Sequence, residues 1–402
     1  MSISARERFL DVCHSKRPGD LYMLGHHVND NFFPETLEEW VKQGAPKEIT
    51  SQRFREDYFQ FPHIRWLGEI ISGDYGQGSE GVRPAIDLGH GITLRGSGRP
   101  LVPDYEPRII SEDEHTVTLR NTRGQTVKSR KEDLKLAWGM PMYLDWLVKD
   151  RATWNELKKR LDPNTPERWP SDWNAYVQEM NSKTEPLTLE VGSFYGYLRE
   201  WVGSERILYM FYDDPKLIED MMEQMLYLEI AVIKRTLKDI KVQQAAFWED
   251  MAYRAGPLIS PAMVRKFMMP RYKKITDLLH SYGVDVVFVD CDGNVEQLIP
   301  LWLEVGVNFI WPFEVAAGND AVAMKKKYGK DLIIGGTIDK RAFIKGKEAI
   351  KEEVMSKVPF LLEQGGYIPS YDHWVMPDVT FENYCYYINL MWEVAGLKKL
   401  SF

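Results

Sequence analysis

Two carboxylates and one thiol follow a strongly apolar segment in the second half of the chain. Residues 284–289 read VDVVFV, and Asp290, Cys291 and Asp292 come directly after them, before a Gly-Asn pair. A nearly continuous β-branched run of this kind is typical of a strand covered on both faces, as in a parallel sheet. Charged groups at the end of a buried strand cost free energy unless something uses them, so we expect a functional site there. The structural alternative is that Asp290 caps the following helix and Asp292 shapes the turn.

Strands and helices alternate around this segment. From residue 185 onward, short apolar runs such as PLTLEV, QAAFW and DLIIGG are separated by long amphipathic stretches. Alternation at this spacing indicates parallel βαβ units, and their number is close to eight. The sequence therefore predicts an α/β protein with a (β/α)₈ TIM barrel rather than an open doubly wound sheet. No GxGxxG or GxxxxGK[ST] motif follows a predicted strand, which weakens a nucleotide-binding interpretation.

Polar residues gather at the predicted carboxyl ends of the strands, where a barrel of this type carries its active site. Such a set suits a metal ion such as zinc, which takes nitrogen, sulfur and oxygen ligands, or a pair of carboxylates for acid–base chemistry. Each member alone has an equally good structural explanation as a helix cap or an ion pair. The members are His26, His27, Asn29, Asp30, Ser193, Tyr195, Glu249, Asp250, Asp290, Cys291, Asp292, Glu314, Asp339, Asp372 and His373.

One segment of the N-terminal part differs in character from the rest. Residues 61–140 are rich in glycine and in short alternating runs, and HTVTLRN followed by QTVKSR is typical of a β-hairpin. We predict that this segment is an inserted β-rich subdomain. It would separate an N-terminal barrel segment, residues 1–60, from the main barrel body, residues 141–402.

Composition excludes several classes of protein. The 402 residues carry a net charge of −8 and no block rich in Lys and Arg, which argues against nucleic acid as a partner. Three widely spaced cysteines (Cys13, Cys291 and Cys385) indicate neither a disulfide framework nor a zinc knuckle. The N-terminus is charged rather than signal-like, and no window approaches about 18 uninterrupted apolar residues, so we expect a cytoplasmic protein with no membrane partner. Aromatic residues reach 12%, a surplus that a pocket for a flat organic ligand would need.

Four segments resemble the uroporphyrinogen decarboxylase superfamily. They read WVGSERILYMFYDDP, GPLISPAMVRKFMMPRYKKI, GGTIDKRAFIKGKEAIKEEV and GGYIPSYDHWVMPDVTFENYCYY, and the resemblance covers residues 185–397 well. It implies a (β/α)₈ barrel and one of two chemistries: decarboxylation of porphyrinogens without a cofactor, or zinc-dependent methyl transfer to or from a corrinoid protein. Members are often dimers, so it also implies a homodimer.

The chain departs from both patterns of the superfamily. True decarboxylases carry an RQAGRY-type segment and an FSD-type motif, and neither occurs here. The zinc methyltransferases carry a His-x-Cys-Gly-Asn motif and a later Cys; alignment places Asp290 and Asp292 at the first two ligand positions and His373 near the third. The resemblance thus implies a zinc site of these three residues, with Glu249 or Cys291 as further ligands. Such hard ligands would leave the metal a stronger Lewis acid and favour an oxygen or nitrogen leaving group.

The leading hypothesis is a methyltransferase. It would move a methyl group from a small methylated substrate to the Co(I) of a partner corrinoid protein, and the Trp and Tyr content suggests an aromatic methyl ether, hence O-demethylation. A metal at Asp290, Asp292 and His373, or an acid such as Glu249 or Asp250, would activate the leaving group. No DxHxxG motif occurs, so the corrinoid would come on the partner.

Substrate binding is assigned to six further residues, and two other functions stay open. The six are His26, Asn29, Tyr195, Trp248, Tyr253 and Asp339, and packing between barrel and helices is the alternative explanation for the aromatic ones. The second hypothesis is a metal-independent decarboxylase that acts on a small carboxylate through Asp290 and Asp292. The third is a non-catalytic corrinoid-binding or scaffold protein that keeps the barrel.

Overall fold

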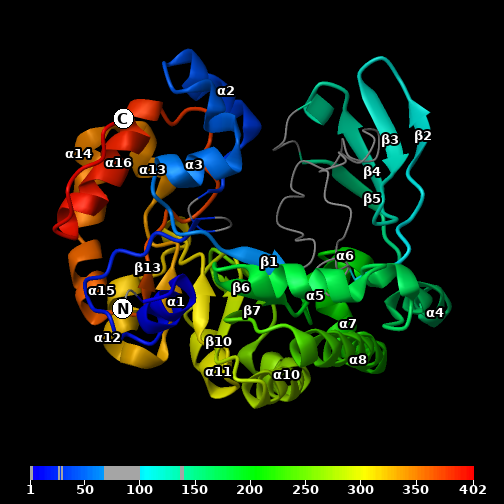
Figure 1. Ribbon diagram of the computed structural model, residues 1–402. Coiled ribbons are helices and arrows are strands. Elements are labelled where there is room, and N and C mark those ends of the chain that lie inside the picture. Colours follow the sequence, from blue (N-terminus) through cyan, green and yellow to red (C-terminus); the bar gives the residue numbers. More distant parts are fainter. Residues whose placement is uncertain (1–2, 26–27, 29, 68–99, 136–139) are drawn as a thin grey trace.

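A parallel sheet of seven strands forms the centre of the protein (Figure 1). The structure is a computed structural model that describes residues 3–25, 28, 30–67, 100–135 and 140–402. The strands of this sheet are β1 (Arg65–Leu67), β6 (Leu187–Glu190), β7 (Gln244–Trp248), β10 (Val286–Asp290), β11 (Phe309–Trp311), β12 (Ile333–Gly335) and β13 (Tyr367–Ile368). They are neighbours in this same order, and every pairing is parallel, as the alternating pattern predicts.

The predicted strand near residue 21 is not a strand in the described part of the chain. Residues 21–24 are buried but irregular, and Gly25 donates its backbone N–H to the Pro62 carbonyl (2.9 Å) beside β1. Farther on, a single parallel bridge joins Phe32 to Val375. Among the described residues, irregular segments rather than a regular strand therefore close the eighth side of the barrel.

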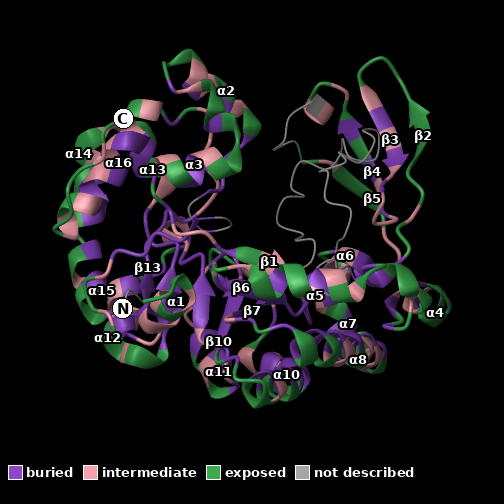
Figure 2. Cartoon of the chain, in the orientation of Figure 1, coloured by how far each residue is buried: buried purple, intermediate pink, exposed green. Residues whose placement is uncertain are grey.

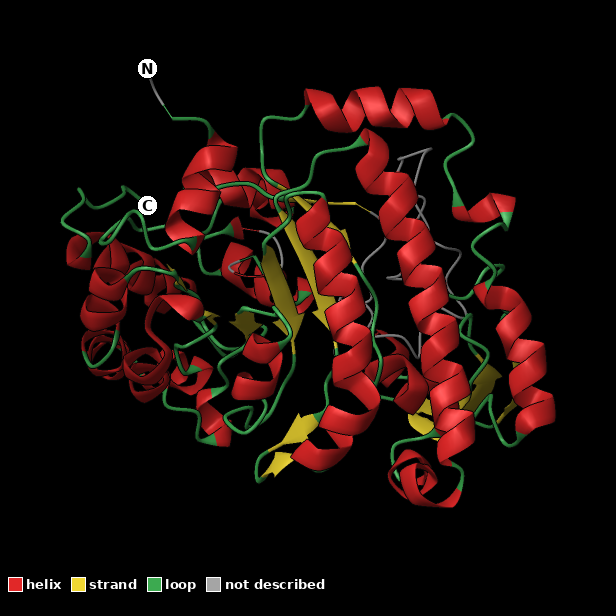
Figure 3. Cartoon of the chain, turned by 90° about the horizontal axis from the view of Figure 1, so that it is seen from below, coloured by secondary structure: helices red, strands yellow, loops and turns green. Residues whose placement is uncertain are grey.

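Helices surround the strands on the outside (Figure 3). A buried layer between helices and strands contains most of the large apolar side chains, and Figure 2 shows the barrel strands β6, β7 and β10 as almost entirely buried. The helices are α1 (Ala5–Cys13), α2 (Pro34–Lys42), α3 (Gln52–Tyr58), α4 (Arg151–Lys158), α5 (Trp173–Ser182), α6 (Gly196–Val202), α7 (Arg206–Asp213), α8 (Pro215–Asp239), α9 (Pro261–Met263), α10 (Met269–Ser281), α11 (Ile299–Glu304), α12 (Ala321–Tyr328), α13 (Lys340–Lys345), α14 (Lys347–Met355), α15 (Val358–Gln364) and α16 (Phe381–Val394).

Local sequence signals explain several helix boundaries. Ser260 caps the helix that starts at Pro261, because its side chain accepts a hydrogen bond from the Met263 N–H (3.3 Å). A π-helical turn, Val264–Met268, then joins α9 to α10 and ends two residues before Pro270, whose missing N–H cannot serve an α-helical bond. The amphipathic stretch KEAIKEEVMSKVPFLLEQ forms two helices rather than one, because α14 ends at Met355 and Pro359 lies in the first turn of α15.

A second, smaller cluster fills the barrel interior. It contains Val286, Phe288 and Phe309 from the strands and Phe9 and Val12 from α1. The Gly366 N–H, next to β13, donates to the Val12 carbonyl (3.1 Å). Helix α1 therefore covers the barrel at the amino ends of its strands.

An antiparallel sheet lies beside the barrel (Figure 1). Its strands are β2 (Arg108–Glu112), β3 (Thr116–Arg120), β4 (Thr126–Arg130) and β5 (Met142–Asp145), and the predicted hairpin is the β3–β4 pair. The boundaries predicted at residues 60 and 140 stay predictions; β1, inside that interval, pairs with the barrel strand β6. No described helix is long and apolar enough to cross a membrane.

Candidate active site

Three aspartates meet at the carboxyl ends of two neighbouring strands. Asp250 follows β7, Asp290 ends β10, and Asp292 begins the next turn. One carboxylate oxygen of each lies within 4.8 Å of the other two, and these three form the only potential metal-ligating group of three or more acidic, His or Cys residues in the described chain. We call Asp250, Asp290 and Asp292 the acidic triad.

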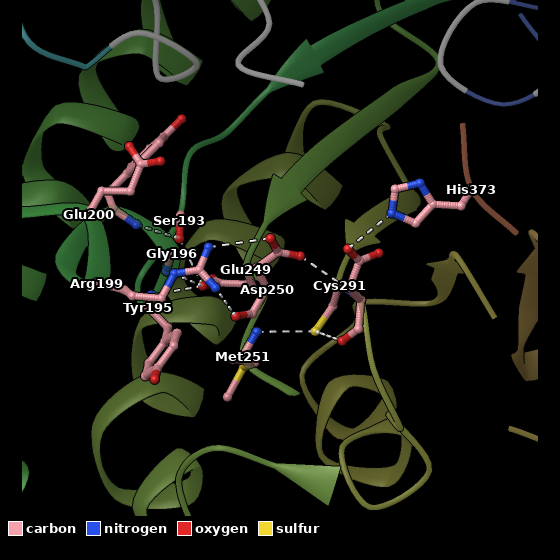
Figure 4. Close-up of polar contacts among 12 residues, drawn as sticks. Ser193, Tyr195, Gly196, Arg199, Glu200, Glu249, Asp250, Met251, Cys291 and His373 are labelled. Carbon is pink, nitrogen blue, oxygen red and sulfur yellow. Dashed lines mark hydrogen bonds and ion pairs between the residues drawn. The ribbon is translucent and has the colours of Figure 1, made fainter. Parts of the chain in front are cut away.

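Asp250 is held in an unusual backbone conformation. Its φ of +44° lies in the left-handed region, which non-glycine residues adopt at a cost of about 1–3 kcal/mol. The Arg199 guanidinium donates to the Asp250 carbonyl (2.7 Å) and approaches its Oδ2 (3.3 Å), and the Asp292 N–H donates to its Oδ1 (3.2 Å; Figure 4). Both carboxylate oxygens are thus oriented by neighbours, as in a site that the surrounding structure has pre-organised.

Asp290 lies between two tryptophans. It pairs in register with Trp248 on β7 and with Trp311 on β11, and residues in register point to the same face of a sheet. Both tryptophan residues are 6% exposed. Burial raises the pKa of Asp290 well above its ordinary range, and repulsion by Asp250 and Asp292 raises it further.

His373 lies near the triad but contacts only one member of it. Its Nε2 is 3.6 Å from Asp292 Oδ2, and its Nδ1 accepts a hydrogen bond from the Trp374 N–H (2.8 Å; Figure 4). Because Nδ1 accepts, the proton of the neutral ring is on Nε2, which points toward Asp292 as a donor. Ligation of a metal through Nε2 would need the other tautomer.

Glu249 uses both carboxylate oxygens to hold the loop before α6. They accept hydrogen bonds from the N–H groups of Phe194 (2.9 Å) and Tyr195 (2.7 Å), from Ser193 Oγ (2.9 Å) and from the Tyr272 hydroxyl (2.6 Å). Burial raises the pKa of Glu249, and these hydrogen bonds act in the opposite direction. The group is fully buried, so the structure places it as a support rather than beside the triad oxygens.

The Cys291 side chain is also not placed to act as a metal ligand. Its Sγ accepts a hydrogen bond from the Met251 N–H (3.3 Å), and the side chain is fully buried in the layer between strands and helices. Burial raises the pKa of the thiol well above its ordinary value, so the thiolate that a metal would need is disfavoured.

Comparison with known proteins decides the family. The profile of the uroporphyrinogen decarboxylase family matches residues 193–393, half of the chain. The chain belongs to the uroporphyrinogen decarboxylase family. Among solved structures, a methyltransferase from Methanosarcina mazei is similar, with a TM-score of 0.55 over 98% of this chain and 99% of that one, at 13% sequence identity. A likeness at this identity shows the fold, and the predicted TIM barrel is confirmed. No curated protein matches the sequence.

The matched region of this uroporphyrinogen decarboxylase family member contains the whole triad, and the oxygen donors fit a divalent cation. Three carboxylates form a hard, negatively charged donor set, which suits Mg²⁺, Mn²⁺ or Zn²⁺ better than a soft ion that prefers thiolate ligands. Asp250 was predicted as a catalytic residue and not as a ligand. The sequence signal was present in the strand end WED, but only the left-handed turn shows that Asp250, rather than Glu249, joins Asp290.

The residues predicted to bind substrate are scattered in this family member. Trp248 lies beside Asp290, whereas Tyr195 is buried against Phe211 (ring centroids 6.5 Å apart). Tyr253 is 54% exposed on the hairpin of β8 (Ala252–Tyr253) and β9 (Gly256–Pro257). Asp339 caps α13 through the Arg341 N–H (2.9 Å). His26 and Asn29 lie outside the described residues.

Trp311 is a candidate that sequence reasoning missed. Its ring is buried in the barrel interior, and its Nε1 donates to Ser370 Oγ (3.1 Å). Gly335 on β12 leaves room for it, since a Cβ there would lie 3.0 Å from Trp311 Cδ1. The motif FIWPFE marks a strand end, but only the register places its tryptophan next to Asp290.

Proposed function

We propose that this protein is a methyltransferase that removes a methyl group from an aromatic methyl ether and passes it to a corrinoid protein. The observation that carries the proposal is Asp290, a half-buried acid flanked in register by Trp248 and Trp311 at the carboxyl ends of the strands. Two indole rings favour a flat apolar ligand. Asp290 would then face the ether oxygen, which gains negative charge as the methyl group leaves. The similar fold of a methanogen methyltransferase supports the proposal.

The reaction places defined demands on the protein. The C–O bond of the ether breaks, the oxygen keeps the electron pair, and the methyl group leaves as a cation equivalent to the nucleophile. The partner corrinoid, when bound, supplies that nucleophile as Co(I). An aryl oxygen is a poor leaving group unless it is protonated or its charge is stabilised, so catalysis depends on a group placed at this oxygen.

The acidic triad would meet this demand in one of two ways. Asp290, whose pKa burial raises well above its ordinary value, would give a proton to the departing phenolate. A divalent ion, zinc in our proposal, would be held by Asp250, Asp290 and Asp292 and would supply Lewis acidity to the same oxygen. His373 would orient Asp292, and Arg199 would orient Asp250.

A direct assay tests the proposal. The protein is mixed with methoxybenzenes and with free cobalamin reduced to Co(I), and the phenol product is measured together with the loss of the Co(I) absorbance. We expect phenol from the wild type and at least a hundredfold slower release from Asp290→Asn. Glu304→Gln, which changes an exposed acid paired with Arg265, is the matched control and should keep the wild-type rate.

The opposite results are equally clear. Equal rates in Asp290→Asn and the wild type would remove Asp290 from the mechanism. Release of CO₂ from small aromatic carboxylates, without phenol from any methyl ether, would overturn methyl transfer in favour of the decarboxylase chemistry of the family name.

A further inference from the structure

A second buried acid lies beneath the loop that starts α6. Glu229 is on α8, it is fully buried, and neither of its carboxyl oxygens has a hydrogen-bond partner in the described part of the protein. A Cβ added at Gly192 would overlap Glu229 Oε1, so the carboxyl group lies directly against the backbone of this glycine. The φ of +82° at Gly192 is in the left-handed region, so the position favours glycine for its backbone as well as for the space that the acid fills.

The surroundings of Glu229 favour its neutral form. A buried carboxylate without hydrogen bonds costs far more free energy than the protonated acid does. The nearby Glu249, by contrast, accepts four hydrogen bonds, which favour its charged form. Burial raises the pKa of Glu229 well above its ordinary value and repulsion by Glu249 raises it further, while the backbone of Ser193 acts in the opposite direction.

The other titratable groups around this acid are tyrosines. Tyr197 on α6 interacts electrostatically with Glu229, and Tyr272 on α10 donates a hydrogen bond to Glu249. Burial raises the pKa of both hydroxyls well above their ordinary value, so both keep their protons at moderately alkaline pH. Among the described residues, no cation is recorded to act on Glu229, and a negative charge on it would therefore be uncompensated.

The loop above Glu229 connects this acid to the acidic triad. Residues 192–196 contact Glu229 at their start, and their next N–H groups donate to the Glu249 carboxylate. Helix α6 follows directly and carries Arg199, whose guanidinium donates to the Asp250 carbonyl (2.7 Å; Figure 4). A displacement of the loop would consequently move Arg199 relative to Asp250.

We infer that Glu229 is a positioning residue whose proton holds this loop, and with it Arg199, in place. With the proton, the acid fills the space beside Gly192 without a charge. When the proton leaves to solvent, two buried carboxylates, Glu229 and Glu249, repel each other, and the loop separates from them. Arg199 then loses its position at Asp250. The inference depends neither on the methyl donor nor on a metal ion.

Hydrogen exchange tests the inference without any turnover. Mass spectrometry follows the amide hydrogens of residues 193–203 in the wild type and in Glu229→Gln, whose side chain has the same shape and no charge. Between about pH 6 and about pH 10, a range that spans the pKa of about 8–9 known for fully buried glutamates, the wild type should lose about tenfold or more in protection relative to Glu229→Gln at the same pH. Comparison at equal pH cancels the intrinsic exchange rate and the titration of groups, such as Lys325, that both proteins share.

Infrared spectroscopy detects the proton directly. The difference spectrum between the wild type and Glu229→Gln at about pH 7 should contain the C=O band of a protonated carboxyl group, and this band should disappear as the protection falls. Glu219→Gln, a half-buried acid on the same helix, is the matched control and should follow the wild type in both experiments. Glu229→Met also removes the charge and should behave like Glu229→Gln. Thermal unfolding confirms that each variant is folded.

Several results would overturn the inference. One is equal protection of the wild type and the two Glu229 variants at every pH, and another is the absence of the C=O band. In the wild type alone, protection of residues 193–203 that changes with pH no more than that of the other helices would also contradict it. A protein that behaves as expected here but transfers no methyl group would overturn the proposed function and leave the role of Glu229 standing.

Discussion

The Tyr272 hydroxyl donates a 2.6 Å hydrogen bond to Glu249 Oε1, and through it α10 is tied to the loop that begins α6. Both side chains are fully buried. The carboxylate collects its other donors from the loop at Phe194 and Tyr195. Two segments far apart in sequence thus meet on a single buried acid, which makes that acid a structural support of the triad.

Loss of this support should lower stability. We expect Tyr272→Phe to reduce the free energy of unfolding by about 1–3 kcal/mol, because the buried carboxylate of Glu249 loses one of its hydrogen-bond donors. Glu249→Gln should reduce the free energy of unfolding by more than Tyr272→Phe does. The amide NH₂ of the glutamine would face backbone N–H groups that need an acceptor. Urea denaturation measures both. Tyr253→Phe, an exposed tyrosine, is the control and should stay within about 0.5 kcal/mol of the wild type.

Stability should rise with pH on the alkaline side because of Lys325. Its Nζ donates to the Leu332 carbonyl (2.6 Å), and burial lowers the pKa of this amine from 10.5 to about 8. Between these values the unfolded chain holds a proton that the folded chain has lost, so the free energy of unfolding increases with pH. From about pH 7.5 to about pH 9.5 we expect a gain of about 2 kcal/mol relative to Lys325→Met at the same pH. A difference between the two proteins that does not change with pH would contradict this assignment.

Metal content should follow the triad and not the other predicted ligands. Mass spectrometry of the purified protein should find about one divalent ion per chain in the wild type and none in Asp250→Asn/Asp290→Asn, because both changes remove ligand charge. Cys291→Ala should keep the ion, since its Sγ is occupied by the Met251 N–H. His373→Ala should weaken binding by about 10–100-fold, the usual effect of an orienting partner. Full loss of the ion from Cys291→Ala would contradict the ligand set.

Trp311 should affect substrate binding more than turnover. With an aromatic methyl ether as the substrate, Trp311→Phe should raise KM by about 3–10-fold, the value of one weakened aromatic contact, while kcat changes little. Trp173→Phe on α5, whose indole pairs with Asp239, is the matched control. A fall in kcat at unchanged KM would place Trp311 at the reacting atoms instead.

Much of the barrel could be predicted from sequence because strand ends and helix starts carry local signals. The apolar run before Asp290 predicts a strand from its own residues, and that strand is confirmed. The Ser-Pro start of α9 is a local signal of the same kind. The irregular chain at residues 21–24 was not predictable in this way. It is apolar like a strand, but its backbone pairing is decided by distant partners such as Pro62.

The site was harder to predict because adjacent residues at a strand end point in different directions. Glu249 and Asp250 differ by one position, and the left-handed turn at Asp250 decides which one reaches Asp290. Likewise, the distance from Asp290 to Trp311 is 21 positions in sequence, and only the register of β10 and β11 makes them neighbours. Neither property can be read from residue types alone.

The position of α1 has a consequence for how ligands reach the site at Asp290. Phe9 and Val12 of α1 pack into the same interior cluster as Phe288 and Phe309, so α1 covers the amino ends of the strands. A molecule that binds at Asp290 would then approach from the carboxyl ends of the strands, the end opposite α1. Under the proposed function, the methyl donor, the demethylated product and the corrinoid partner would share this end of the barrel. They would therefore have to bind and dissociate in a fixed order.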